Sequence, residues 1–159
     1  MTVRHAKSSE ISEIMRIYRA AKAYMDANGN ATQWEVGYPS EGMVEEDIRN
    51  ERLYVIEADG GIHAVFFFAV GEDATYRKIY EGKWLHDLPY GVIHRVASDG
   101  TRKGVMRVIV SYCRERISTL RIDTHENNLT MQNALGRLGF TRCGMIYLEN
   151  GDPRIAYQI

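Results

Sequence analysis

The feature that most constrains this chain is an uninterrupted apolar run from Ala64 to Val70, which includes three consecutive phenylalanines. A strand with one face in water alternates apolar and polar residues, whereas this run has no polar face. It therefore predicts the central strand of a sheet that is covered on both sides. The run is far shorter than the roughly 18 to 20 residues that cross a bilayer, so no membrane span is expected.

Length and charge narrow the class of protein further. With 159 residues the chain lies in the usual range for one domain, and we expect residues 1–159 to form a single domain. Its 20 basic and 21 acidic residues give a net charge of −1, which supplies no field to attract nucleic acid or an anionic membrane surface. Residues 1–7 lead into a polar Ser-Ser-Glu stretch without a hydrophobic signal region, so a cytoplasmic location is expected.

Neither the cysteines nor the acidic residues form a metal-binding pattern. Cys113 and Cys143 lie 30 residues apart without companion thiols, so both are expected to be reduced and buried. The run Asp123-Thr124-His125-Glu126 lacks the H-E-x-x-H spacing, and no second cluster completes a site. We therefore expect no metal, and a metal-dependent hydrolase is the least favoured interpretation.

Hydrophobic periodicity and turn residues predict elements in the order β, α, α, β, β, β, α, β, α, β, β. The expected strands cover residues 2–5, 53–58, 62–70, 90–97, 119–124, 142–148 and 154–158, and the expected helices cover about 8–28, a short stretch after Ser40, 104–117 and 130–138. Residues 72–89 are polar with scattered aromatics and are expected to form a long insertion with a helical turn. This order predicts an α+β fold with one central mixed sheet, in which hairpins stand at each end of a parallel crossover.

The segment from Val92 to Met106 is predicted to pass from a strand through a polar, glycine-bearing loop into a buried helix. Such a junction directs backbone N–H groups and the positive end of a helix dipole at one spot, which suits a pyrophosphate. Arg102 and Lys103 add positive charge there. The dinucleotide pattern G-x-G-x-x-G is absent, and the Walker pattern fails because Val105 follows Gly104. The alternative is an ordinary strand-to-helix connection.

The sequence downstream resembles a known family. Residues 120–132, LRIDTHENNLTMQ, followed by Leu138-Gly139-Phe140, are similar to the second half of the cofactor-binding core of the GNAT superfamily of acyl-CoA-dependent N-acetyltransferases. The resemblance covers roughly residues 90–148 in motif detail, and the element order matches over the whole chain. It implies a sheet of about seven strands flanked by about four helices, in which two parallel strands splay apart to form the slot for acetyl-CoA.

The resemblance also implies which residues bind the cofactor. The family loop pattern R/Q-x-x-G-x-G/A falls on residues 101–106, where the first and last positions, Thr101 and Met106, depart from it. The backbone amides of Arg102, Lys103, Gly104 and Val105 are expected to hold the phosphates of coenzyme A. Backbone groups of Val96 and Ala97 are expected to pair with the pantetheine arm, and the family asparagine falls on Asn128.

Candidate catalytic residues follow from the same alignment of motifs. The family tyrosine that protonates the departing thiolate falls on Leu135, so that acid is missing. A thiol has a pKa near 8.5, which makes the thiolate a tolerable leaving group without one. Tyr147 and Tyr157, on the last hairpin, are candidate substitute acids, with packing as the alternative. His94 is the candidate general base, because the unperturbed pKa of histidine, about 6.5, suits removal of a proton from an amine, with a satisfied buried histidine as the alternative.

The loop between the first two predicted helices lines the acceptor site in GNAT enzymes, and here it contains Gln33, Trp34 and Tyr38 as candidate substrate-binding residues. The alternative is that these aromatics belong to the core. Acidic residues around the first loops mildly favour a cationic amine; they are Glu35, Glu41, Glu45, Glu46 and Asp47.

These observations predict an N-acetyltransferase that moves an acetyl group from acetyl-CoA to a primary amine of a small molecule or peptide, by direct attack in a ternary complex. The alternative is a non-catalytic acyl-CoA-binding sensor or interaction module, which the missing tyrosine and the altered phosphate loop favour. A homodimer, formed through an exposed sheet edge or through residues 72–89, is left open.

Overall fold

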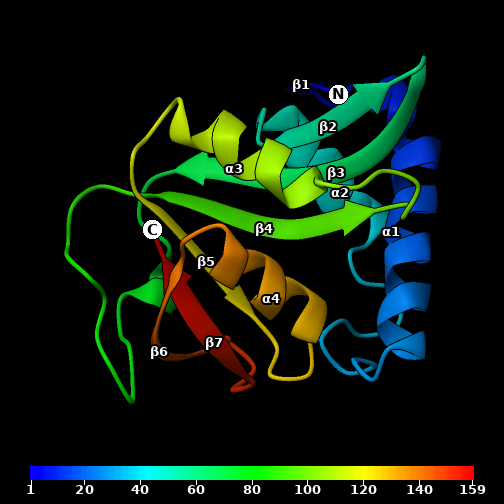
Figure 1. Cartoon of the computed structure of the whole chain (residues 1–159). Helices are drawn as coiled ribbons and strands as arrows, with labels where there is room; N and C mark the ends of the chain where they lie inside the picture. The colour runs from blue at the N-terminus through cyan, green and yellow to red at the C-terminus, as the bar shows by residue number, and fades with distance from the viewer.

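The computed structural model describes all residues from Met1 to Ile159 and contains one sheet with four α-helices (Figure 1). The strands are β1 (Thr2–His5), β2 (Leu53–Ala58), β3 (Gly61–Val70), β4 (Gly91–Ser98), β5 (Leu120–Thr124), β6 (Thr141–Tyr147) and β7 (Pro153–Gln158). The helices are α1 (Ile11–Ala27), α2 (Glu41–Arg49), α3 (Val105–Arg114) and α4 (Leu129–Arg137), with 3₁₀ turns at Ser8–Glu10 and Ala74–Tyr76.

The sheet has seven strands in the order β1-β2-β3-β4-β5-β7-β6. All neighbours are antiparallel except β4 and β5, which are parallel and are joined through α3. The predicted α+β fold with a mixed sheet and a parallel crossover is therefore confirmed. No helix of the chain combines the length and the apolar character that a bilayer crossing requires.

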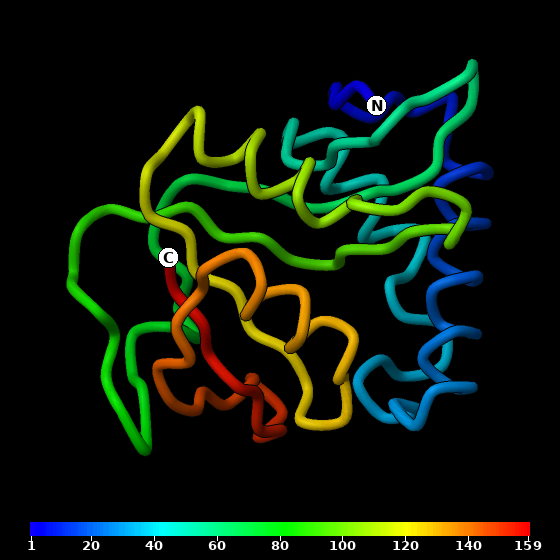
Figure 2. The backbone as a smooth tube through the Cα atoms, viewed as in Figure 1, coloured from blue at the N-terminus to red at the C-terminus, as the bar shows by residue number.

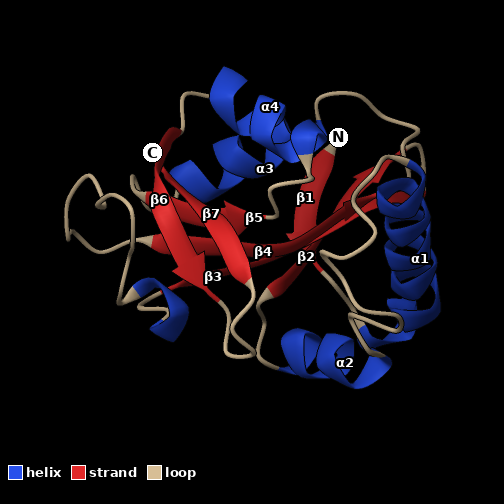
Figure 3. Cartoon of the chain, turned by 90° about the horizontal axis from the view of Figure 1, so that it is seen from below, coloured by secondary structure: helices blue, strands red, loops and turns tan.

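The apolar run on β3 is buried on both faces, as predicted. Phe66 and Phe68 pack under α3, whereas Phe67 packs on the opposite face with residues of α1. Helices α3 and α4 lie on one face of the sheet and α2 on the other (Figure 3), and α1 packs on the same face as α2. Alternate side chains of one strand thus supply two cores, which explains why the run has no polar position.

The parallel pair is paired only at its start. Gly91 lies opposite Leu120 and Val92 opposite Arg121, and no later residue of β4 pairs with β5. On its other side β4 pairs with β3, but the register shifts between Val65 and Phe67. Opposite that irregularity Arg95 has φ +48°, a left-handed conformation that interrupts a regular strand. The two strands therefore separate towards their carboxyl ends.

Residues 72–89 form a wide loop beside the C-terminal strands, drawn green in Figure 2. Its helical content is one 3₁₀ turn, as predicted. The loop is anchored by the guanidinium of Arg121, which lies between the rings of Trp84 and Tyr90 at 4.1 Å from each centroid. Tyr80 also bridges Met145 on β6 through backbone hydrogen bonds. The loop thus forms a third small core on the face of β7 that α4 does not cover.

Strand bounds agree with the predictions to within one residue, but two helix predictions differ. Helix α3 ends at Arg114 rather than Ile117, because the backbone N–H groups of Arg116 and Ile117 both donate to the carbonyl of Cys113 and form a tighter turn there. The first helix begins at Ile11 after a 3₁₀ turn, and no serine side chain caps it.

Candidate active site

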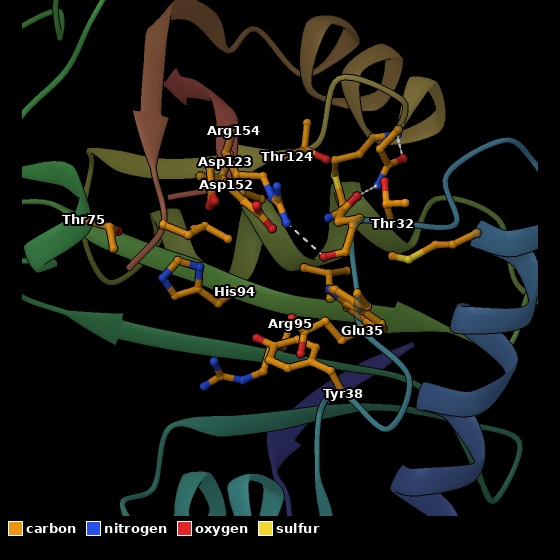
Figure 4. Close-up of a pocket in the computed structure, with 18 of the residues that line it drawn as sticks. Thr32, Glu35, Tyr38, Thr75, His94, Arg95, Asp123, Thr124, Asp152 and Arg154 are labelled. Atoms are coloured by element: carbon orange, nitrogen blue, oxygen red, sulfur yellow. Dashed lines mark hydrogen bonds between the residues drawn. The ribbon is translucent and has the colours of Figure 1, made fainter. Parts of the chain in front are cut away.

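A cavity of about 540 Å³ opens where β4 and β5 separate (Figure 4). Three groups of residues line it: His94, Arg95, Val96, Asp123 and Thr124 from the splayed strands; Thr32, Gln33, Trp34, Glu35 and Tyr38 from the loop between α1 and α2; and Glu149, Asn150, Asp152 and Arg154 from the last hairpin. Asp73 and Thr75 from the long insertion also line it, as do Met25 of α1 and Asn128 and Met131 at the start of α4. The cavity is thus built from parts of the sequence that lie far apart.

His94 faces this cavity and is held by the insertion. Its Nε2 lies 2.8 Å from Oδ2 of Asp73. Burial raises the pKa of Asp73, but hydrogen bonds from His94 and Thr75 outweigh burial and hold that pKa below its ordinary range. An ionised carboxylate only accepts hydrogen bonds, so we assign the proton to Nε2. Nδ1 of His94 then carries the free lone pair and makes no hydrogen bond within the protein.

A second acidic group lies beside this pair. Asp123 on β5 accepts a hydrogen bond from the hydroxyl of Tyr76 at 3.3 Å. Burial raises the pKa of Asp123, with the charges of His94 and Arg154 acting in the opposite direction. Burial likewise raises the pKa of Tyr76, and the nearby carboxylates add to that shift. The cavity therefore holds two carboxyl groups whose pKa values are displaced in opposite directions around one histidine.

The bulge at Arg95 is held from three sides. Its carbonyl oxygen accepts a hydrogen bond from the hydroxyl of Tyr18 at 3.1 Å. Its guanidinium pairs with the carboxylate of Asp47 at 2.8 Å and lies 4.6 Å from the ring centroid of Phe67. Burial raises the pKa of Asp47, although Arg95 opposes the shift. A left-handed arginine costs free energy, so these contacts are what keep the strand open at this point.

The start of α3, which follows β4 in the chain, has free backbone N–H donors. Helix α3 begins at Val105, after Gly104, which has φ +77° and open space around it, and no side chain caps the helix. By contrast, Ser40 caps α2 and Asn128 caps α4. Nearby, the hydroxyl of Thr124 is buried without any hydrogen-bond partner. An uncapped helix start and an unpaired buried hydroxyl fit the phosphates and the amide-bearing arm of coenzyme A.

Of the two basic side chains in the loop before α3, only that of Arg102 has a partner within the protein. Arg102 binds Asp59 of the β2–β3 turn at 2.8 Å, and Lys103 is exposed without a partner. The loop is shaped instead by Asp99, which accepts hydrogen bonds from the amide and hydroxyl of Thr101 at 2.9 and 2.6 Å and lies 3.0 Å from His63. Arg102 is therefore engaged away from the helix start, which leaves Lys103 and the backbone N–H groups for an anion.

The three candidate acceptor residues all line the cavity, but each also has a packing role. Trp34 is buried, with ring centroids 5.8 Å from both Tyr18 and Tyr38. The side-chain oxygen of Gln33 accepts hydrogen bonds from Asn30 and Asn128 at 2.8 and 2.9 Å. Only the amide nitrogen of Gln33 is left for a ligand.

Other predicted site residues lie at the edge of the cavity or outside it. The side chain of Asn128 is engaged on both atoms, since its oxygen caps α4 and its nitrogen binds Gln33. Val96 lines the cavity, but Ala97 is buried opposite Val65 of β3. Val105 packs in the core below α3 and contributes only its backbone to the helix start.

The two candidate acids do not reach the site. Tyr157 is buried in the core beneath α3 and α4, because it alternates with Ala156, which faces the insertion. Tyr147 is exposed and packs edge-on against Tyr80, with ring centroids 5.1 Å apart. Neither lines the cavity, so the geometry gives neither of them access to a thioester. Leu135, at the family tyrosine position, is fully buried in the same core as Tyr157.

Asp73, Tyr76 and Arg154 were missed by sequence reasoning. Asp73 and Tyr76 lie in the insertion, whose place in the fold no local pattern reveals, although Asp73-x-Thr75 is typical of a side-chain turn. Arg154 lies in a strand whose residues read as packing positions. No group of three or more His, Cys, Asp or Glu side chains is placed to hold a metal ion.

A splayed parallel pair, an uncapped helix start behind it and a histidine in front of it define the class of acyl-CoA-dependent transferases. A crystal structure of a GNAT-family acetyltransferase from Streptococcus agalactiae superposes on this chain with a TM-score of 0.89 and 35% sequence identity. The match covers 99% of this chain and 93% of that one. The chain therefore belongs to the GNAT family of acetyltransferases.

More distant structures share the fold alone. GNAT-family acetyltransferases from Listeria monocytogenes and Bacillus cereus give TM-scores of 0.72 and 0.62 at 18% and 20% identity. Each match covers 99% of this chain, and 93% and 95% of the respective relatives. No protein-family model matches the sequence, and no curated protein does.

Proposed function

We propose that this protein is an N-acetyltransferase that moves the acetyl group of acetyl-CoA to a primary amine of a small molecule or peptide, in a ternary complex without an acyl-enzyme. The observation that carries the proposal is the His94–Asp73 pair, which faces the cavity at the point where β4 and β5 part. Both cysteines are buried, and burial raises the pKa of each thiol, for Cys113 to about 12, which argues against a cysteine nucleophile.

His94 and Asp73 act on the acceptor amine before it attacks the thioester. Nδ1 of His94 takes a proton from the acceptor ammonium, and Asp73 stabilises the imidazolium that forms. The free amine attacks the thioester carbonyl, so that a C–N bond forms and the C–S bond breaks, and the attacking nitrogen gives its second proton to water. The thiolate of coenzyme A leaves with its electron pair, because no acid faces it and none is required at neutral pH.

Acetyl-CoA is the substrate that the slot fits best. In this proposal the uncapped amides at the start of α3 bind its phosphates, and the unpaired hydroxyl of Thr124 binds its pantetheine arm. Backbone groups near Val96, which lines the cavity, bind the thioester carbonyl. A donor aimed at the developing oxyanion is worth about 3 to 4 kcal/mol.

The fold leaves the acceptor open. A ribosomal-protein-alanine N-acetyltransferase from Brucella melitensis and an agmatine N-acetyltransferase both share the fold, at 17% and 10% identity. The acidic residues of α2 that favoured a cationic amine do not line the cavity, and Asp47 is paired with Arg95. Of that acidic group only Glu35 faces the acceptor space.

Free-thiol release from acetyl-CoA with a panel of amines tests the proposal. We expect acceptor-dependent thiol release, and His94→Gln lowers kcat by about 10²- to 10⁴-fold. The matched control is His5→Gln, an exposed histidine on β1 outside the cavity, which should keep full activity. Binding of acetyl-CoA without acceptor-dependent thiol release would instead favour the sensor alternative, and an unchanged rate and pH profile in His94→Gln would remove His94 from the mechanism.

A further inference from the structure

Arg154 is a buried basic group of the cavity that no part of the mechanism uses. It is 5% exposed and lies on β7, with its guanidinium at the cavity wall (Figure 4). Nη1 donates to the carbonyl of Pro153 at 2.8 Å and Nη2 to the carbonyl of Gln33 at 2.9 Å. No carboxylate forms an ion pair with it. A guanidinium has five N–H donors, so these two carbonyls leave donors unused.

The other deeply buried arginine, Arg121, is enclosed by protein groups on every side that carries a contact, although its Nε has no hydrogen-bond partner. Arg121 lies between two aromatic rings, bonds to the carbonyl of His86 at 2.8 Å and has Asp87 at 3.9 Å. Arg154 stacks on no ring and forms no ion pair, although the charge of Arg154 acts on the nearby Asp123. A buried charge that is not directly paired is costly, and this one borders an open cavity rather than packed protein.

The surroundings indicate which anion would complete the site. Asp123 shares the cavity with Arg154, and Glu35, Glu149 and Asp152 stand exposed around the cavity mouth. These acids repel a doubly charged phosphate more strongly than a singly charged carboxylate. A carboxylate also matches the planar fork of a guanidinium.

We propose that Arg154 binds a carboxylate of the acceptor, so that the enzyme acetylates amines that also carry a carboxyl group, such as free amino acids. This inference rests on the proposed function. The acceptor amine faces His94 on β4, and the acceptor carboxylate forms a bidentate pair with Arg154 on β7.

The test compares carboxylate-bearing amines with matched amines that lack the carboxylate. The probes are common L-amino acids and ω-amino acids of increasing length, each beside its carboxamide, with thiol release from acetyl-CoA as the readout. We expect kcat/KM to favour at least one acid over its amide by about 100-fold, since a buried charge pair is lost with the amide. In Arg154→Gln that preference falls to within a few fold, mainly through KM.

The ratio of acid to amide separates binding from support of the loop. If Arg154 only anchors Gln33, the Arg154→Gln change lowers both rates equally and leaves the ratio unchanged, which overturns the inference. Arg142→Gln, the same change at an exposed site on neighbouring β6, is the control and should leave the ratio and the rates unaltered. Arg154→Lys keeps the charge but not the fork, and should retain part of the preference.

Failure of this inference differs from failure of the proposed function. Thiol release that is equal for acids and amides, or faster for amides and diamines, overturns the carboxylate site and leaves the transferase intact. Absence of thiol release with any amine removes the transferase proposal itself. As a readout independent of turnover, calorimetric binding of the preferred acid should weaken by a similar factor in Arg154→Gln.

Discussion

Asp73 is the residue on which the proposed acid-base chemistry most depends, because its carboxylate orients His94 and fixes which nitrogen carries the proton. Its hydrogen bonds to His94 and Thr75 also make it a source of stability. The pKa of Asp73 lies below its value of 3.8 in an unfolded chain, so the folded state binds a proton less readily than the unfolded state. This carboxylate therefore stabilises the fold above about pH 5, and the contribution is lost as the pH falls through 3.8 towards the folded pKa.

Asp73→Asn should lower the free energy of unfolding by about 1 to 3 kcal/mol at pH 7. The difference between the two proteins should shrink as the pH falls below about 4, because the wild-type carboxylate then gains a proton as well. Urea denaturation of both proteins at pH 7, 5 and 3.5 measures this. Asp26→Asn, an exposed carboxylate near the end of α1, serves as the control. A difference that stays constant or grows towards acid pH would show that the hydrogen bonds are not made to an ionised carboxylate.

Single residues of the site were predicted where a family motif or a loop position marked them, as for His94, Gln33 and Tyr38. Their partners were not, because a hydrogen bond such as that between Asp73 and His94 joins residues 21 positions apart through an irregular loop. Tyr157 was predicted as a candidate acid because strand alternation alone does not tell which face of β7 meets the cavity. Arg154 lines the cavity and Ala156, on the same face, packs against the insertion, whereas Tyr157 faces the opposite core.

Among the elements, the loop of residues 72–89 does more than its sequence suggests. It supplies Asp73 to the cavity and Tyr76 as the partner of Asp123. Further along, at Gly82, the loop passes closely over β6. A Cβ atom on Gly82 would overlap the carbonyl oxygen of Cys143, which is backbone and cannot yield. A glycine in this segment reads as an ordinary loop residue, yet the structure makes it the point of closest approach between the insertion and the sheet.

Gly82→Ala should therefore destabilise the protein by about 1 to 3 kcal/mol, the usual cost of forcing extra atoms into a packed site. The matched change is Gly136→Ala in α4, where a Cβ atom meets nothing within 4 Å and the backbone is helical. That change should stabilise the protein by about 0.5 to 1 kcal/mol, because glycine is a poor helix former. Thermal denaturation of the two variants beside the wild type measures both signs. Equal effects would mean that the insertion shifts freely over β6.

At the scale of the whole molecule, the sequence predicted the order of elements and the mixed sheet because these follow from hydrophobic periodicity and turn residues. The slot itself has a different origin. It arises where β4 and β5 stop pairing after Val92, and the bulge that accompanies it depends on Tyr18, Asp47 and Phe67, contributed by other elements. The residues of β4 alone do not predict those contacts, so only the family resemblance indicated that β4 and β5 separate.

Binding of acetyl-CoA in the space between β4 and β5 should stabilise the whole protein, because a ligand that binds only the folded state shifts the equilibrium away from unfolding. Acetyl-CoA at 100 times its dissociation constant should add about 2.7 kcal/mol to the free energy of unfolding, which raises Tm by about 5 to 10 °C in a chain of this size. NAD and ATP should give no comparable shift, since the sequence lacks their phosphate-binding patterns.

Thr124→Val keeps the shape of the side chain and removes the buried hydroxyl that has no partner. The free variant should be as stable as the wild type or slightly more so, because an unpaired polar group is lost from the interior. Its affinity for acetyl-CoA should nevertheless fall about 5-fold, the value of one hydrogen bond to the ligand. Thermal shift titrations of both proteins measure the two effects together. A variant that loses stability but binds acetyl-CoA unchanged would mean that Thr124 faces the core, and that the slot holds its ligand elsewhere.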